Sequence, residues 1–330
     1  PACYGLGGEL PTVTDANLVL GRLTSGLAGG GVELDYGSAT KAVGTIATAL
    51  NLELAAAADG ILRIAIENMA AGIRTVSVKR GRDPRDYALV AFGGAGPLHA
   101  CYLADWLDMK QVVIPPSPGV TSAYGLLLTD VRIDLVHTDV QREDQLDHER
   151  VEKQFDELES KVAQRLAGEG FSADSVALTH FIDMRYGGQA YEIRVPCSVD
   201  AGPIIERLAS AIAAFHVAHK DLYGYSYESR ELVELVNVGV TGLGLLKRPQ
   251  IPAAVMGDSA PDAALRDTTE VYFPQSRGKV ACPIYGRALL KAANLIEGPA
   301  IVEQYDSTTV INPGWGGRID EWGSLVLTKQ

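Results

Sequence analysis

A continuous apolar run that leads into a glycine-rich turn most restricts how this chain can fold. Residues 87–92 are apolar without alternation, which predicts a strand covered on both faces of its sheet. Residues 93–96 supply the turn, and Pro97 suits the first turn of a helix that can continue over 98–107. Such a strand, turn and helix is typical of an α/β layer with parallel strands.

The glycines of this turn lie where a ligand could approach the backbone closely. Free N–H groups and the helix dipole at the start of a helix favour an anion such as phosphate. The spacing is neither G-x-G-x-x-G nor G-x-x-x-x-G-K-[ST], and strand-to-helix packing also uses glycine, so a ligand role and a packing role both stay open. His99 could contact a ligand or only hydrogen-bond locally. The candidate ligand-binding residues of this unit are Gly93, Gly94, Ala95, Gly96, Pro97 and His99.

The character of the chain changes at about residue 134. Residues 1–134 contain strand and helix patterns and are expected to form one domain. Residues 135–150 include a charged stretch without an apolar period, which indicates a linker. Residues 151–330 are expected to form an α+β domain that ends in a β-rich module. The further elements expected are a strand over 111–114, a helix over 120–128, a helix over 151–168, a hairpin over 179–195, a helix over 205–219 and a strand over 236–240.

Composition narrows the functional classes. The net charge of −12 argues against nucleic-acid binding, which needs a surface dominated by lysine and arginine. The uncharged stretch 87–104 has the length of a membrane span, but its glycines and proline interrupt it, so no membrane association is expected. The four cysteines form no C-x-x-C pair, which argues against a zinc ribbon and fits a reducing cytoplasm.

Other polar residues have structural alternatives to a functional role. Asp15 could hold Mg²⁺ near a nucleotide, while the local sequence favours Thr14 or Asp15 as the cap of a short helix. His216 and His219 have helical i, i+3 spacing, but no third ligand is evident and no metal site is expected. Asp306 begins an Asp-Ser-Thr-Thr run that is typical of an Asx turn.

Several segments resemble the hydantoinase A / 5-oxoprolinase family, which also includes a subunit of acetone carboxylase. Residues 1–8 contain P-A-C-Y-G and G-G, residues 12–23 read T-V-T-D-A-N-L-V-L-G-R-L, and residues 88–100 read A-L-V-A-F-G-G-A-G-P-L-H-A. These segments match the family signature almost word for word. Shorter matches, in a consistent order, lie at 60–63, 118–123, 183–192, 223–225 and 298–303.

The resemblance implies the second half of an actin-like (ribonuclease H-like) ATPase domain, followed by a mixed, β-rich C-terminal domain. It implies ATP with Mg²⁺ in the complete enzyme, and residues 92–99 are similar to the family's adenosine-side glycine turn. Members of the family phosphorylate the amide oxygen of a cyclic amide such as a hydantoin or 5-oxoproline, which makes the carbonyl carbon a better electrophile for water. Carboxylase relatives instead activate a ketone and bicarbonate. Many members work with a hydantoinase B-type subunit.

One departure from the family pattern is large. No D-x-G-G-T phosphate loop occurs in the 330 residues. We therefore expect the chain to be the C-terminal portion of a longer subunit that lacks the N-terminal half and cannot hydrolyse ATP alone. The alternatives are a subunit of an acetone carboxylase-like enzyme and a module for binding and assembly without catalytic residues.

Overall fold

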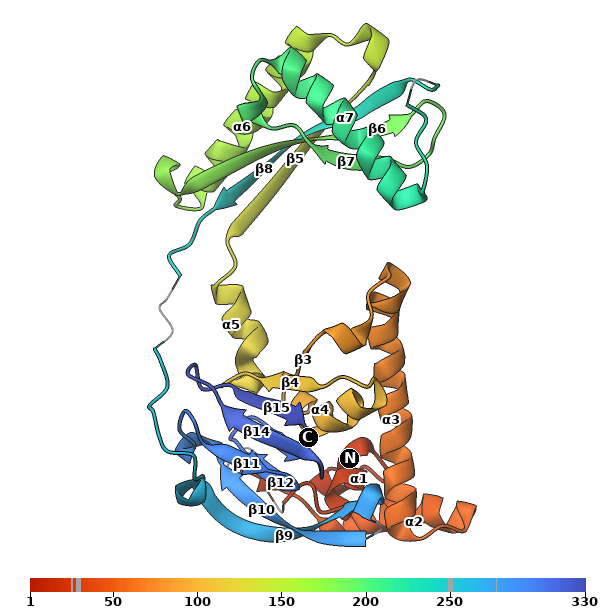
Figure 1. The fold of residues 1–330 in the computed structure, drawn as a ribbon, viewed down its shortest axis with the longest axis vertical. Coiled ribbons are helices and arrows are strands. Elements are labelled where there is room, and N and C mark those ends of the chain that lie inside the picture. Colours follow the sequence, from red (N-terminus) through yellow and green to blue (C-terminus); the bar gives the residue numbers. More distant parts are fainter. Residues whose placement is uncertain (25, 28–30, 229, 249–251, 277) are drawn as a thin grey trace. The chain divides into compact units, whose positions relative to one another are not determined.

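The chain forms two compact units, one inserted into the sequence of the other (Figure 1). The computed structural model describes residues 1–330 except 25, 28–30, 229, 249–251 and 277. The first unit comprises Pro1–Leu127 and Gln250–Gln330, and the second comprises Leu128–Pro249. These compact units differ from the expected division at residue 134, because the strands after residue 250 complete the sheets of the first unit.

The expected linker over 135–150 is wrong. Strand β5 (Val131–Arg142) pairs antiparallel with β8 (Val233–Gly244), and α6 begins at His148. Side chains along β5 alternate between half-buried and exposed over most of its length. The charged stretch over 141–150 that suggested a linker includes the end of β5, a single turn at Glu143–Gln145 and the start of α6.

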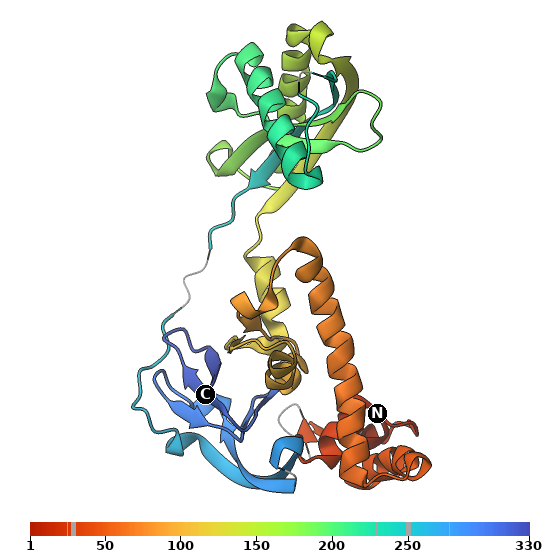
Figure 2. The same cartoon turned by 45° about the vertical axis from the view of Figure 1, so that its right-hand side comes forward.

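Among the described residues, five α-helices belong to the first unit. The long α3 packs against α1, α2 and α4 (Figure 2). Thr12, rather than Thr14 or Asp15, caps α1, and Asp15 occupies the third helical position of a capping box. The predicted helices at Pro97 and over 120–128 are confirmed as α4 and α5. The helices are α1 (Val13–Val19), α2 (Tyr36–Leu50), α3 (Leu54–Val76), α4 (Gly96–Trp106) and α5 (Thr121–Leu127).

Three sheets, counted over the part of the unit that the structure describes, complete it. The orders are β1-β2, β13-β12-β10-β9 and β11-β14-β15-β4-β3, and the C-terminal β15 pairs antiparallel with β4. Strand β4 matches the prediction, whereas β11 and β14 were not predicted. The strands are β1 (Gly26–Leu27), β2 (Val32–Glu33), β3 (Leu89–Val90), β4 (Gln111–Ile114), β9 (Leu265–Phe273), β10 (Gly278–Gly286), β11 (Leu295–Glu297), β12 (Ala300–Glu303), β13 (Thr308–Ile311), β14 (Trp315–Ile319) and β15 (Leu325–Lys329).

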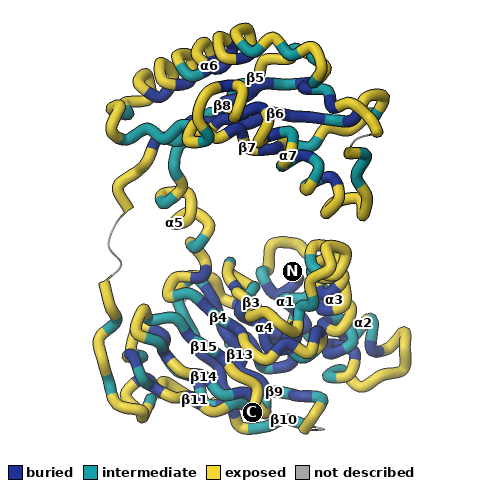
Figure 3. The backbone as a smooth tube through the Cα atoms, turned by 45° about the horizontal axis from the view of Figure 1, so that its top comes forward, coloured by how far each residue is buried: buried dark blue, intermediate teal, exposed yellow. Residues whose placement is uncertain are grey.

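Strand β3 differs from its prediction. It pairs parallel with β4, as expected, but contains only Leu89–Val90 and lies at the edge of its sheet. Val90 is 54% exposed and Phe92 is 48% exposed, so the strand is not covered on both faces. The buried strands β4 and β15 lie further inside the same sheet (Figure 3).

The second unit packs two helices on an antiparallel sheet of order β5-β8-β6-β7. Its core joins apolar side chains of both helices to those of the strands, including Phe155, Ile182 and Phe215. The predicted helices and the strand over 236–240 are confirmed, and so is the pairing of the hairpin, although its second strand begins only at Ile193. Its remaining elements are α6 (His148–Gly168), β6 (Val176–Tyr186), β7 (Ile193–Pro196) and α7 (Ile204–Tyr223). Over the described parts of the chain, no helix is both long enough and apolar enough to cross a membrane.

Candidate functional site

The glycine turn connects β3 directly to α4. Gly93 has a φ of +83°, which side-chain-bearing residues rarely adopt, and its N–H donates to the carbonyl of Pro118 at 2.7 Å. Ala95 is the N-cap residue of α4, and no side chain among the described residues caps this end. The backbone N–H groups at the start of α4 therefore have no side-chain acceptor in the part of the chain that the structure describes and are available to a ligand.

Two loops that lie far from this turn in the sequence form hydrogen bonds with it. In the β12–β13 loop, residues 304–307, the Ser307 hydroxyl donates to the Gly94 carbonyl at 3.1 Å. The Asp306 Oδ2 atom accepts from the Gly119 N–H at 2.8 Å, and the Gln304 amide donates to the Pro116 carbonyl at 2.6 Å. These hydrogen bonds join residues 93–96, 116–119 and 304–307 into one wall.

A cavity of about 1180 Å³ opens beside this wall, within the first unit. Gly94, Ala95 and Leu98 line it from the turn and helix, and Tyr305 and Asp306 line it from the β12–β13 loop. The volume is sufficient for a ligand of nucleotide size, since small-molecule sites typically measure about 300–1,000 Å³. Of the seven predicted site residues, Gly94 and Ala95 are the two that line the cavity within the described structure.

His99 lies behind the wall, in the core. Burial, together with the nearby positive charge of Arg22, lowers the pKa of His99 to about 4, so the ring is neutral near pH 7. The Arg22 guanidinium lies 4.6 Å from the centre of the Tyr102 ring, and the Tyr102 hydroxyl donates to Asp59 at 2.9 Å. Among the described residues, His99 is not one of those that line the cavity.

Asp15 is buried, and its carboxylate accepts hydrogen bonds from the first residues of the sequence. Its Oδ1 accepts from the Cys3 N–H at 2.8 Å, and its Oδ2 accepts from the Thr12 hydroxyl at 2.7 Å and from the N–H groups of Thr12 and Ala2. Burial opposes the charge of this carboxylate, but the hydrogen bonds outweigh burial and lower its pKa. Since both oxygens already accept hydrogen bonds, the geometry favours the capping role over Mg²⁺ binding.

The histidines of α7 have hydrogen-bonding partners within the second unit. His216 Nδ1 lies 2.7 Å from the Tyr186 hydroxyl, and His219 Nδ1 lies 2.8 Å from the Tyr225 carbonyl oxygen. His219 Nε2 lies 3.2 Å from the Gln189 side-chain amide. No group of three or more His, Cys, Asp or Glu side chains that could hold a metal ion occurs among the described residues.

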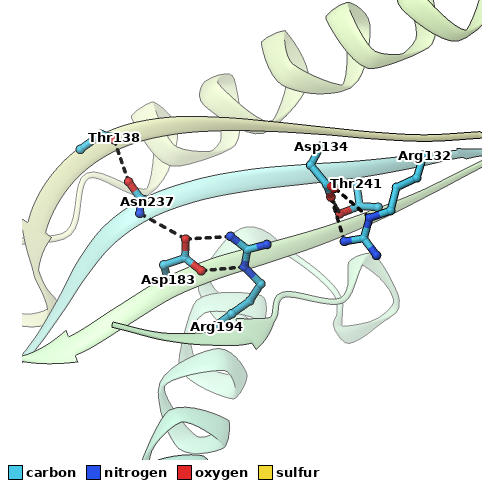
Figure 4. A network of polar contacts seen from close by, with 7 residues as sticks. All are labelled: Arg132, Asp134, Thr138, Asp183, Arg194, Asn237 and Thr241. Carbon is cyan, nitrogen blue, oxygen red and sulfur yellow. Dashed lines mark hydrogen bonds and ion pairs between the residues drawn. The ribbon is translucent and has the colours of Figure 1, made fainter. Parts of the chain in front are cut away.

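A polar network also extends across the sheet of the second unit (Figure 4). The Asp183 carboxylate accepts two hydrogen bonds from Arg194, at 2.8 and 3.1 Å, and one from Asn237 at 3.2 Å. Asp134 accepts from Arg132 and Thr241 in the same way. Each of these two carboxylates forms an ion pair with an arginine of the same sheet, and the hydrogen bonds of the network link neighbouring strands.

Sequence reasoning missed the contribution of the β12–β13 loop to the wall. The loop follows the glycine turn by about 210 residues, and only the fold brings Ser307 to Gly94. The sequence predicts only a local turn at Asp306, and no pattern in it marks Tyr305. A local motif could not have identified these residues.

Comparison with known proteins gives consistent matches over the whole chain. Residues 1–135 match the family model described as Hydantoinase/oxoprolinase, and residues 138–330 match the one described as Hydantoinase/oxoprolinase C-terminal domain. An uncharacterized protein of Methanocaldococcus jannaschii is 40% identical over 329 residues, which cover 100% of this chain and 46% of that protein. The caprolactamase subunit alpha of Pseudomonas jessenii is 34% identical over 99% of this chain and 48% of its own length.

Two solved structures share the fold. The crystal structure of the ATP-dependent caprolactamase from Pseudomonas jessenii superposes with a TM-score of 0.81 at 34% identity, covering 100% of this chain and 48% of that chain. A nucleotide-free acetone carboxylase structure gives a TM-score of 0.83 at 23% identity, with the same coverage. The fold class expected from the resemblance is confirmed, and the chain spans about half the length of the relatives it matches.

Proposed function

Because the chain belongs to the hydantoinase/oxoprolinase family, we propose that it forms the nucleoside-side wall of the ATP site in an ATP-dependent enzyme that opens cyclic amides. The observation that carries the proposal is the position of Gly94 and Ala95. They lie on the cavity wall, at the uncapped start of α4, where a ligand can contact the backbone directly. The similarity to an ATP-dependent caprolactamase supports the same assignment.

The proposed reaction uses ATP with Mg²⁺ to activate the amide oxygen of a hydantoin, 5-oxoproline or similar lactam toward water. The role of this chain is to bind and orient the nucleoside end. The Mg²⁺ and phosphate contacts, and the partner of hydantoinase B type, are assigned to parts of the enzyme outside this chain, which spans about half the length of its matched relatives. We also propose that the enzyme acts in the cytoplasm. Its four cysteines are buried free thiols, and thiols stay reduced in that compartment.

The runner-up function, a subunit of a ketone carboxylase, would use the same wall. The chain is 34% identical to the caprolactamase subunit alpha and 31% identical to the gamma subunit of an acetophenone carboxylase, so the preference for the cyclic amide rests on a difference of three percentage points. A Cβ at Gly94 would lie 3.5 Å from the Asp306 carbonyl oxygen, which is ordinary contact, and Gly94 is not among the glycines with positive φ. A side chain at position 94 therefore adds bulk to the cavity wall without straining the turn.

The test is a calorimetric titration of the 330-residue chain with ATP and AMP, with and without Mg²⁺. We expect both to bind with similar affinity and little dependence on Mg²⁺, and we expect Gly94→Val to weaken both at least tenfold. The matched control is Gly72→Val, at an exposed position in α3 where a Cβ meets nothing within 4 Å. Unchanged affinity in a folded Gly94→Val protein would contradict the assignment of the wall.

A further inference from the structure

The β12–β13 loop has features of a ligand-contacting element in addition to closing the wall. Its ends are fixed, because the Gln304 N–H donates to the Ser307 carbonyl at 2.9 Å and the side chains of Gln304 and Ser307 hold the two neighbouring loops. Residues 305 and 306 therefore form the tip of a braced turn. A tip held in this way loses little conformational freedom when it binds a ligand.

Tyr305 is a large aromatic side chain at the edge of the cavity. It is 74% exposed and lines the same cavity as Gly94 and Ala95. Burying its ring on folding would have been favourable, yet the fold leaves the ring uncovered beside the proposed nucleotide wall. A flat, apolar face in this position suits the face of a nucleobase, because every base can stack on an aromatic ring.

Asp306 gives this end of the cavity a negative charge. Its Oδ2 accepts from Gly119, while its Oδ1 is buried and has no hydrogen-bond partner within the described part of the chain. The loop also lies close to the turn, since a Cβ at Gly94 would be 3.5 Å from the Asp306 backbone oxygen. A carboxylate repels a phosphate, so the uncharged end of a nucleotide fits beside this loop better than its phosphates.

From these observations we propose that the β12–β13 loop is the nucleoside-recognition element of the site. Tyr305 stacks on the base, and Asp306 directs the phosphates away from the loop. This inference rests on the proposed function and deepens it, because it assigns the selectivity for a nucleoside to a loop about 210 residues from the glycine turn. Recognition of the nucleoside then depends on base and sugar more than on the phosphate.

The experiment compares adenosine, AMP and ribose 5-phosphate as ligands in calorimetric titrations of the 330-residue chain. We expect adenosine and AMP to bind within a few-fold of each other, and ribose 5-phosphate to bind at least tenfold more weakly. Tyr305→Ala is expected to weaken adenosine and AMP about tenfold or more, while Tyr305→Phe keeps most of the affinity, because base stacking on an aromatic ring is lost only in the first variant. The matched control is Tyr191→Ala, which removes a tyrosine of 78% exposure from the second unit.

The outcomes separate this inference from the proposed function. If AMP binds the wild-type chain, Gly94→Val weakens it and Tyr305→Ala does not, the loop assignment is overturned and the wall remains. If ribose 5-phosphate binds as tightly as AMP, recognition lies at the phosphate and the inference also fails. If neither adenosine nor any nucleotide binds, the proposed function itself fails, and the inference fails with it.

Discussion

At the scale of single residues, His99 predicts how stability depends on pH. Its pKa is lowered to about 4 in the folded state, mainly by burial, against a value of 6.5 for the free group. Between these values the unfolded chain binds a proton that the folded chain does not, so the free energy of unfolding falls as the pH falls through this window. The loss reaches about 3 kcal/mol by pH 4.

The measurement is urea unfolding of the wild type and His99→Gln between pH 7.5 and pH 4, followed by tryptophan fluorescence. All three tryptophans, Trp106, Trp315 and Trp322, lie in the first unit with His99, so the signal excludes His180, whose pKa burial also lowers but which lies in the second unit. The difference in pH dependence between the two proteins isolates His99. Parallel curves would contradict the prediction.

How much of the site the sequence could predict depended on how local each residue's role is. Gly94 and Ala95 were found because a glycine turn between strand and helix is a pattern of adjacent residues. Asp15 could not be resolved, since a capping carboxylate and a metal ligand have the same neighbours in sequence, and only its four donors distinguish them. The role of Tyr305 could not be predicted from the sequence, because tertiary packing alone brings it to the same cavity as the turn.

At the scale of elements, β3 shows what an apolar run does and does not predict. The run over 87–92 correctly indicated a strand parallel to β4, but hydrophobicity does not reveal which segment of chain would supply the cover. In this chain the strand is at the edge, with Val90 and Phe92 about half exposed. The long apolar run was therefore a better guide to the existence of the strand than to its burial.

The position of β3 at the edge of the sheet predicts unequal effects of the same substitution in the two paired strands β3 and β4. Val90 pairs with Val113 and is exposed, whereas Val112 pairs with Leu89 and is fully buried. We expect Val90→Lys to change the free energy of unfolding by no more than about 0.5 kcal/mol, and Val112→Lys to destabilise by several kcal/mol because it buries a charge. Urea unfolding followed by tryptophan fluorescence measures both. A large loss in Val90→Lys would mean that β3 is covered.

At the scale of the whole molecule, separate cores predict separate unfolding. The core of the second unit contains Phe215, and a core of the first contains Leu327, both fully buried. Phe215→Ala should destabilise only the second unit, by about 3–5 kcal/mol, and Leu327→Ala only the first. Tryptophan fluorescence reports the first unit alone, and far-ultraviolet circular dichroism reports both. A shift of the fluorescence midpoint in Phe215→Ala would show that the two units unfold together.

The pairing of β15 with β4 has a consequence for how the protein is made. Residues 325–328 hydrogen-bond with residues 111–114, so this sheet forms only after residues 325–328 have left the ribosome. At roughly 5–20 residues per second, β4 waits about 10–40 s for that partner. The inserted unit is complete once residue 249 has emerged, and it can fold while β4 is still unpaired. In a nascent chain the inserted unit can therefore fold before this sheet, and before Ser307 has reached Gly94 to complete the wall.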